Sequence, residues 1–404
     1  MSDNTVLGSW FLVLAGLLYA QPALAAGFAI GEQGAGARGV GGAATARADL
    51  GGAGFHNPAA FGFADSLMIS AGVSGLAPSV AHVQPGSGEQ TGAQTDLSTI
   101  PYGHVGYRFG DFGVGLSFDV PFGSGLSWPK DWRGRFEITS IELQVFEVAG
   151  VVVWRPIDEL SIAAGPRLGR STVGYGRQID AVDTEGSVQL AGDATGLGAQ
   201  LALMYRPLDE LTLGLSWRSR MHLDFSGWAN FEDVPIELQQ KAHDQYVTTE
   251  LTLPDRIALG AAWAFDDAIA SVDVTYWTWS TFQEFGIDFA HDQTPDVTQP
   301  RNWNDSITLA AGWEQKGWVE DLDLRVGLAF DMAPSPSNTL SPSSPDGNRL
   351  IPSLGAGYTV VDGLQVDVGY GHVVFMGAEA SGDAFPGSYD ASAELLSLGV
   401  TYRP

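Results

Sequence analysis

The side chains that could carry out chemistry are few and widely spaced. The chain has no cysteine, which excludes disulfides, thiolate metal sites and cysteine nucleophiles. The seven histidines lack the spacing of a metal site: His56, His82, His104, His222, His243, His291 and His372. The glycines of residues 31–54 lack the strand and helix that flank a phosphate-binding loop. We therefore expect no enzyme, no metal and no cofactor. An acyl hydrolase remains an alternative, because a serine–histidine triad is recognisable only by its geometry.

Four aromatic residues are candidates for binding an apolar ligand. They lie where the alternation of a strand breaks down: Trp277, Trp279, Phe282 and Phe285. The two tryptophans share the inward parity of Asp273 and Thr275, so they would face the interior of a folded wall. The alternative is packing in a loop or in a belt of aromatic residues at a membrane surface.

Three arginines are candidates for binding a ligand that carries a carboxylate, because such a ligand needs a base in the interior. They are Arg167, Arg301 and Arg325. The alternative for each is a charge of the wall that pairs with a nearby acid such as Asp323.

The composition places these residues in an acidic chain of moderate hydrophobicity. Of 404 residues, 45% are hydrophobic and 17% are charged, and the mean hydropathy is +0.04. These values exclude a disordered chain and a helical membrane protein. Forty-seven acids against 20 bases give a net charge of −27, which argues against nucleic-acid binding. We attribute the charge to solvated loops, with a specific cation site as the alternative.

Residues 1–25 are typical of a secretory signal peptide. The apolar run Val6–Ala20 is followed by a small-residue cleavage pattern at Ala23–Ala25, so the mature chain would begin at Ala26. The leader departs from the usual pattern because it has no Lys or Arg and contains Asp3. No later apolar run is long enough to cross a membrane as a helix. A membrane protein of this sequence would therefore be a β-barrel.

The segment that follows, residues 26–65, is dense in Gly and Ala up to about residue 63 and carries few large side chains. Glycine reaches backbone conformations that other residues cannot, but such a segment makes a poor helix and a poor strand. We expect a compact unit that packs inside walls supplied by residues 66–404.

Those residues alternate with a period of two. In residues 322–331 one face carries Leu, Leu, Val, Leu and Phe, and the other carries Asp, Arg, Gly, Ala and Asp. Fourteen runs read as strands, an even number as in bacterial barrels. They lie near residues 66–83, 100–109, 112–121, 137–154, 158–178, 186–205, 209–229, 246–265, 268–289, 304–315, 321–332, 351–361, 363–376 and 391–402.

Two further patterns favour a membrane barrel over a soluble sandwich. Four runs end in an aromatic residue with an aspartate four residues later, at a tight turn: Tyr107, Trp154, Tyr205 and Tyr358. The linkers on the opposite side, such as residues 78–101 and 333–349, are longer, polar and mostly acidic. Short turns beside an aromatic belt, with long loops at the other rim, are typical of an outer-membrane barrel. The expected fold class is all-β, a transmembrane antiparallel β-barrel of about fourteen strands with an N-terminal plug inside.

Eight motifs in one order make the chain resemble the FadL/TodX family of outer-membrane hydrophobic-compound transporters over essentially its whole mature length. They include AGFAI at the mature start, Asn57-Pro58-Ala59 and PFGSGLSWPKDWRGRF at residues 121–136. The others begin at residues 213, 251, 276, 302 and 324. The resemblance implies a fourteen-stranded barrel that is closed by an N-terminal hatch and holds a hydrophobic pocket.

By the same resemblance, the Ala26 amine and Phe28 lie near the inner pocket. The family's ligand is thought to leave sideways into the membrane, at an inward kink in the third strand. That kink falls here in residues 113–121, which include Gly113, Gly115 and Pro121. It would lie beside the hatch motif formed by Asn57, Pro58 and Ala59. Proline removes a ladder donor and glycine packs no side chain, so such a strand is easily interrupted.

We therefore expect a passive channel for long-chain fatty acids or hydrocarbons in the bacterial outer membrane. Fatty-acid-binding members place a Lys before the Asp of the NWND-like motif, where this chain has Asn304. Neutral hydrocarbons therefore remain candidate ligands beside fatty acids. The expected partners are the hydrophobic ligand, outer-membrane lipid and lipopolysaccharide, with no nucleic acid and a monomeric state. One alternative is a polar-solute porin, with a charged interior and no hatch. The other is the acyl hydrolase, now placed in the outer membrane.

Overall fold

The computed structural model describes residues 27–31, 33–180, 184–382 and 385–404. The predicted signal peptide and Ala26 lie outside these residues. The described chain forms a closed antiparallel barrel of fourteen strands, as the sequence predicts. It closes where β1 pairs with β20, from Ile69 opposite Tyr402 to Val83 opposite Ser388.

Three strands of the wall are each divided into two segments. The wall consists, in order, of β1 (Leu67–Val83), β3 (Ser98–Phe109), β4 (Phe112–Ser127), β5 (Ser140–Ile157), β6 (Leu160–Asp180), β7 (Glu185–Tyr205), β8 (Leu211–Arg218) with β9 (Met221–Glu232), β10 (Gln245–Leu253) with β11 (Arg256–Ala264), β12 (Ala268–Trp277) with β13 (Glu284–Phe289), β15 (Ser306–Val319), β16 (Leu322–Asp331), β17 (Asn348–Val361), β18 (Leu364–Met376) and β20 (Gly387–Tyr402). Three short strands, β2 (Gln90–Gly92), β14 (Val297–Pro300) and β19 (Glu379–Ala380), lie in the connections.

The period-two pattern separates the two faces of the wall, as predicted. On β20, Leu396, Leu398 and Val400 are exposed on the outside, whereas Ser397 and Thr401 are buried inside. A wall whose outer face is apolar and exposed is what a lipid bilayer requires.

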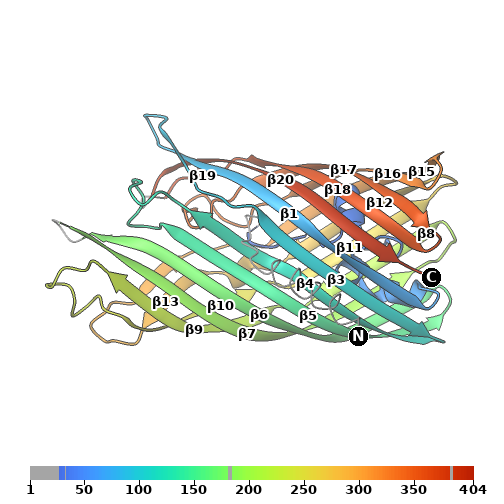
Figure 1. The fold of residues 1–404 in the computed structure, drawn as a ribbon, viewed down its shortest axis with the longest axis horizontal. Coiled ribbons are helices and arrows are strands. Elements are labelled where there is room, and N and C mark those ends of the chain that lie inside the picture. The colour runs from blue at the N-terminus through green and yellow to red at the C-terminus, as the bar shows by residue number, and fades with distance from the viewer. Residues whose placement is uncertain (1–26, 32, 181–183, 383–384) are drawn as a thin grey trace, which may run out of the picture.

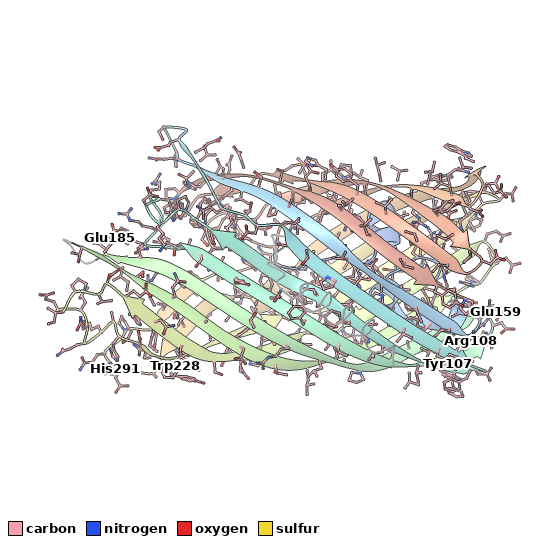
Figure 2. The ribbon with its side chains drawn as sticks, in the orientation of Figure 1. Tyr107, Arg108, Glu159, Glu185, Trp228 and His291 are labelled. Atoms are coloured by element: carbon pink, nitrogen blue, oxygen red, sulfur yellow. The ribbon has the colours of Figure 1, made fainter. Side chains whose placement is uncertain are left out.

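The two ends of the barrel differ, again as predicted. Tyr107 and Trp154 are half-exposed beside short turns. Figure 2 shows Tyr107 at the end with the short turns and Trp228 at the end with the long loops. The strand ends differ from the predicted ones by a few residues. The predicted runs 209–229, 246–265 and 268–289 are the three interrupted strands.

The N-terminal segment, residues 27–63, lies inside the cylinder near the end with the short turns (Figure 1, blue). It contains α2 (Ala35–Gly39), α3 (Ala53–His56) and the 3-10 helix η1 (Pro58–Phe63). Helix α2 packs on β16, β17, β18 and β20, and η1 packs on β3 to β7 across the lumen. A side chain on wall Gly327 would collide with Gly41, with its Cβ 2.1 Å from the Gly41 nitrogen. Small residues on both sides therefore allow this close approach.

No helix among the described residues is long and apolar enough to cross a membrane.

Candidate ligand site inside the barrel

Five aromatic side chains gather in the lumen around a sixth, Phe28. The ring of Phe28 lies 4.7 Å from Trp279, 5.7 Å from Trp303 and 5.8 Å from Phe282, measured between centroids. Phe122 and Trp277 complete this aromatic cluster. Such edge-to-face packing buries large apolar surfaces and orders the rings.

Local backbone features bring the cluster together. Strand β12 ends at Trp277, and a 3-10 turn, η2 (Trp279–Thr281), then carries the chain inward. Gly27 has a φ of +61°, and a Cβ there would lie 2.6 Å from the Trp303 ring. A glycine is therefore required where the N-terminal segment meets the cluster.

An apolar cavity of about 650 Å³ adjoins the cluster. Apolar side chains dominate its lining: Phe28, Ile141, Leu143, Val173, Phe225, Leu251, Phe282 and Phe285. Arg301 lines one part of it with Ser343 and Ser344 from the 333–347 loop. The other polar lining residues are Ser124 of β4 and Thr249 and Glu250 of β10. A mostly apolar cavity with a few convergent polar groups is typical of a small-molecule site.

Arg301 is the one predicted base that lines this cavity. It is 3% exposed, and its guanidinium donates to Ser341 Oγ at 2.7 Å, and to Ser343 Oγ and Gln299 Oε1 at 2.9 Å. No carboxylate of the described chain lies within 4.0 Å of it. The guanidinium also lies 5.7 Å from the Phe285 ring centroid. Burial lowers the pKa of Arg301 to about 10, so it remains charged at neutral pH.

The other two predicted arginines have carboxylate partners. Arg167 donates to both oxygens of Glu147, at 3.0 and 2.5 Å. Arg325 pairs with Glu314 at 2.6 Å and Asp367 at 2.5 Å. Neither lines the apolar cavity, so the alternative of a wall charge describes their positions.

The wall is interrupted between β3 and β4. The two strands pair from Phe109 opposite Phe112 to Gly103 opposite Phe118, and then separate. Beyond this separation, Gln94, which precedes β3, forms an isolated bridge with Ser127 of β4. We call the unpaired stretch between residues 95–102 and 119–126 the β3–β4 window.

One extra residue in β4 creates this interruption. Asp119 pairs with Glu147 of β5, but Phe122 pairs with Val145, so β4 advances three residues while β5 advances two. Such a bulge bends its strand. Pro121 lies at the bulge, and its carbonyl accepts from the Ile30 amide at 2.8 Å. The Gly123 amide donates to the Phe28 carbonyl at 2.8 Å. The N-terminal segment therefore takes the place of a ladder partner at this point.

The other predicted gate residues lie elsewhere. Gly113 and Gly115 are in the regular part of the β3–β4 ladder, so the irregularity lies at 119–122, the end of the predicted range. A Cβ on Gly115 would lie 2.5 Å from the Phe61 ring, so this glycine accommodates η1.

The Asn57-Pro58-Ala59 motif anchors the N-terminal segment to β6 and β7. The Asn57 amide donates to the carbonyls of Thr45 at 2.8 Å and Leu203 at 3.0 Å. Ser161 Oγ donates to the Ala59 carbonyl at 2.7 Å. Pro58 occupies the first position of η1, where a missing N–H costs nothing.

One serine–histidine–aspartate chain is assembled in the wall beside the window. Ser70 Oγ lies 3.1 Å from His104 Nδ1, and His104 Nε2 lies 2.8 Å from Asp119 Oδ1. All three side chains are buried, Gly54 packs against the His104 ring, and none of the three lines the apolar cavity. A nucleophile needs room for its substrate, so this chain joins β1, β3 and β4 structurally.

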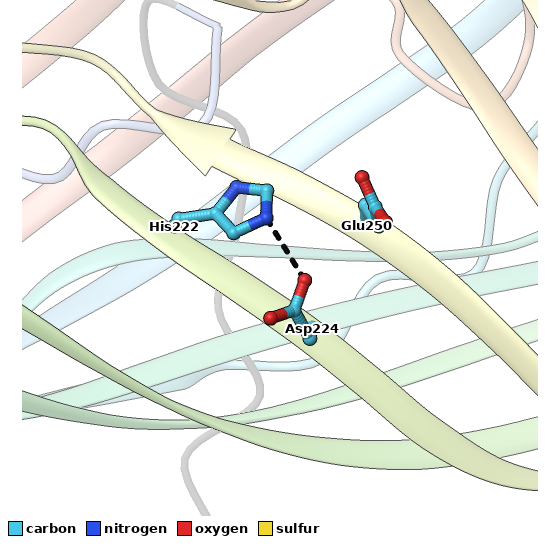
Figure 3. Close-up of side chains that lie close together, drawn as sticks. All are labelled: His222, Asp224 and Glu250. Atoms are coloured by element: carbon cyan, nitrogen blue, oxygen red, sulfur yellow. Dashed lines mark ion pairs between the residues drawn. The ribbon is translucent and has the colours of Figure 1, made fainter.

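A second polar group lies on the outer surface. Figure 3 shows His222 and Asp224 on β9 with Glu250 on β10, all exposed. His222 already contacts Asp224 and Thr252 through its two ring nitrogens, at 2.9 Å each. The group is therefore a surface ion pair with a neighbouring acid.

Sequence reasoning missed Phe122 and Trp303 of the aromatic cluster. Phe122 faces inward only because the bulge changes the parity of β4. Trp303 lies in the connection before β15, where no periodic pattern applies. Only its place in a family-like motif at residues 302–312 could have indicated it.

Comparisons with known proteins agree with this architecture. The family model for outer membrane protein transport proteins (OMPP1/FadL/TodX) matches residues 16–403. A long-chain fatty acid transport protein of Escherichia coli is 24% identical, with 91% of each chain covered. A putative outer membrane protein of Neisseria meningitidis is 24% identical, covering 94% of this chain and 95% of the relative.

Solved structures show the same fold. A Pseudomonas aeruginosa FadL homologue superimposes with a TM-score of 0.84 at 20% identity, covering 94% of this chain and 100% of the other. The Pseudomonas putida toluene transporter TodX gives a TM-score of 0.71 at 16% identity, covering 91% of this chain and 97% of the other.

Proposed function

This chain belongs to the OMPP1/FadL/TodX family of outer-membrane transport proteins, and from this premise we propose that it is a passive channel for a hydrophobic acid. In this proposal the ligand binds in the apolar cavity and leaves through the β3–β4 window into the membrane. The observation that carries the proposal is the position of Phe28. Its ring lines the cavity, and its carbonyl accepts from Gly123 at the edge of the window.

The cavity suits a hydrocarbon chain. Its lining is mostly aliphatic and aromatic, and each methylene gains about 0.8 kcal/mol on leaving water. A route through aqueous periplasm would lose that gain, whereas a side opening into the bilayer would keep it. The transfer needs neither a nucleotide nor an ion gradient.

Arg301 extends the proposal to an acid. Its side-chain partners are hydroxyl and amide oxygens, which orient a guanidinium without neutralising it. A carboxylate at the polar end of the cavity would supply the missing negative charge, with charge-assisted hydrogen bonds. Arg301 would therefore take the part that a Lys plays in related motifs, where this chain has Asn304. Among the ligands of named relatives, a long-chain fatty acid fits this arrangement better than toluene.

The way in which the window is closed supports the proposal of lateral release. The backbone of Phe28 and Ile30 pairs with Gly123 and Pro121, and Gln33 Nε2 donates to the Val120 carbonyl at 2.7 Å. A ligand that displaces Phe28 would therefore disturb the same hydrogen bonds that occupy the free edge of β4.

We expect Arg301→Gln to weaken dodecanoate binding by about tenfold or more, the value of one charge-assisted contact of about 1.5–3 kcal/mol. Binding of dodecanol, which has no charge, should change less than twofold. Equilibrium binding to purified protein in detergent measures both. Arg170→Gln is the matched control, because Arg170 pairs with Asp193 on the exposed outer face. Equal dodecanoate affinity in the wild type and Arg301→Gln would contradict carboxylate recognition.

A further inference from the structure

The lumen contains a second cavity, of about 870 Å³, which shares no lining residue with the apolar one. Phe28 lines the apolar cavity and its neighbour Ala29 lines this one. Trp277 of the aromatic cluster also faces it. The aromatic cluster therefore lies between two compartments. We call the second one the lower chamber.

The lower chamber is basic, although the whole chain is acidic. Four basic side chains line it against two acids: Arg38, His56, Arg256 and Arg349, with Asp273 and Asp331. In a chain with a net charge of −27, this concentration of bases is unexpected. It points to an interior requirement for positive charge.

Both acids of the chamber have other roles. One oxygen of Asp273 accepts from the backbone amides of Ala44 at 3.0 Å and Thr45 at 2.8 Å, which fixes the N-terminal segment. Asp331 lies 3.8 Å from Arg349 and accepts from Thr308 Oγ1 at 2.8 Å. Neither acid is therefore a hydrogen-bond partner of Arg256 or His56.

Arg256 and His56 make no side-chain hydrogen bond among the described residues, and Asp273 attracts the Arg256 charge only from beyond 4.0 Å. Arg256 is 6% exposed, no carboxylate of that part of the chain lies within 4.0 Å, and its Nη1 makes no hydrogen bond. Its guanidinium lies 5.6 Å from the Phe55 ring and 5.9 Å from the Trp277 ring. His56 is 3% exposed, and both of its ring nitrogens are without a hydrogen-bond partner there. Buried groups of this kind carry a desolvation cost that a bound anion would offset.

We propose that the lower chamber is an anion site, in which Arg256 and His56 bind a carboxylate group. The guanidinium offers donors in a fixed plane, and the aromatic rings beside it hold that plane. The carboxylate has two possible sources, the head of an amphiphilic ligand or a free small acid anion. The site does not depend on Arg301 or on the apolar cavity.

Iodide is the probe, because it binds as an anion and quenches tryptophan, and Trp277 lines the chamber. Wild-type protein in detergent should show a saturable component of iodide quenching in addition to the linear one from exposed tryptophans. The saturable component should disappear in Trp277→Phe. Iodide affinity should fall about tenfold or more in Arg256→Gln and be kept within threefold in Arg256→Lys. Arg170→Gln, on the outer face, should leave it unchanged.

Competition identifies the source of the carboxylate. Displacement of iodide by dodecanoate but not by formate indicates the head group of an amphiphile, and displacement by both indicates a free acid anion. If neither displaces iodide, or if wild type shows no saturable component, the proposal is wrong. If Arg256→Gln does not fold, the competition in wild-type protein decides. Iodide affinity should be unchanged in Arg301→Gln, because Arg301 does not line the lower chamber, so the two proposals fail separately.

Discussion

Arg301 differs from the other two arginines that the sequence singles out, Arg167 and Arg325, in what it contacts. Arg167 and Arg325 each donate to carboxylates at 2.5–3.0 Å, so their charge is already compensated. Arg301 contacts serine hydroxyls and an aromatic ring instead. The loop that supplies those hydroxyls therefore controls the polar end of the apolar cavity.

That loop contains a titrating group, Asp346, and should depend on pH. Asp346 is buried in the 333–347 loop, and burial raises its pKa to about 6. Because the folded pKa lies above the ordinary 3.8, the folded loop binds the proton more tightly. Its stability is therefore greatest below about pH 4, falls as the pH rises through 6, and stays low above that. A difference of about two in pKa corresponds to roughly 3 kcal/mol.

Hydrogen exchange of the loop amides, corrected for the intrinsic rate, measures this. We expect faster opening of residues 337–347 at pH 7.5 than at pH 5.0, and no such difference in Asp346→Asn. Glu89→Gln, in an exposed turn, is the control and should keep the wild-type dependence. A loop with the same protection at both pH values would contradict the assignment.

The sequence identifies all three arginines as candidates for binding a carboxylate. It does not show which of them already pair with an acid of the wall. Glu147 lies 20 residues from Arg167 on the neighbouring strand, and Asp367 lies 42 residues from Arg325, two strands away. Which acid reaches which arginine therefore depends on strand register. Arg301 lies in a connection between strands, where parity predicts nothing. The local sequence pattern therefore identifies which residue types are present. Their roles depend on which residues the pairing of strands brings together.

At the scale of elements, β4 departs from a regular strand at its bulge. The alternation of residues 112–118 predicts its lower half, which pairs on both sides. The second half of β4, after Asp119, depends on the one extra residue of the bulge. In a period-two pattern, that residue is visible only as a change in which alternate residues face inward. The same limit explains the three interrupted strands, which read as continuous in sequence. Regular pairing can thus be predicted from side-chain periodicity, but bulges and breaks depend on what packs inside.

His104 should hold β4 in place at the edge of the window marked by Asp119, because it links Ser70 of β1 with Asp119 of β4. Replacing it with phenylalanine keeps a ring beside Tyr102 but removes both hydrogen bonds. We expect amide exchange in residues 119–126 to quicken about tenfold or more, since hydrogen bonds to a charged group contribute about 1.5–3 kcal/mol. His222→Phe, on the outer face, should have no effect there. Unchanged exchange at 119–126 in His104→Phe would show that the histidine does not hold the window.

At the scale of the whole molecule, a rigid wall surrounds a segment made of small residues. The N-terminal segment contacts β16 to β18 through α2, β5 to β7 through η1, and β4 through Phe28 and Ile30. It therefore touches the apolar cavity, the lower chamber and the window at once. The sequence predicts this internal packing from composition alone, because only small residues let backbone approach backbone inside a closed wall. Which strand the segment completes could not be predicted, because that depends on the bulge.

Deletion of Pro121 tests the central claim, that ligand leaves through the β3–β4 window. Removing the one extra residue restores the register between β4 and β5, so β4 can continue its ladder along β3 and close the window. Deletion of Gln240, in an exposed loop, is the matched control. The measurement is dodecanoate uptake by cells that carry equal amounts of folded protein, with binding to purified protein measured in parallel. We predict that the Pro121 deletion binds dodecanoate within threefold of wild type but transports none above background. Wild-type uptake through a barrel whose β3–β4 ladder is shown to be complete would contradict lateral release.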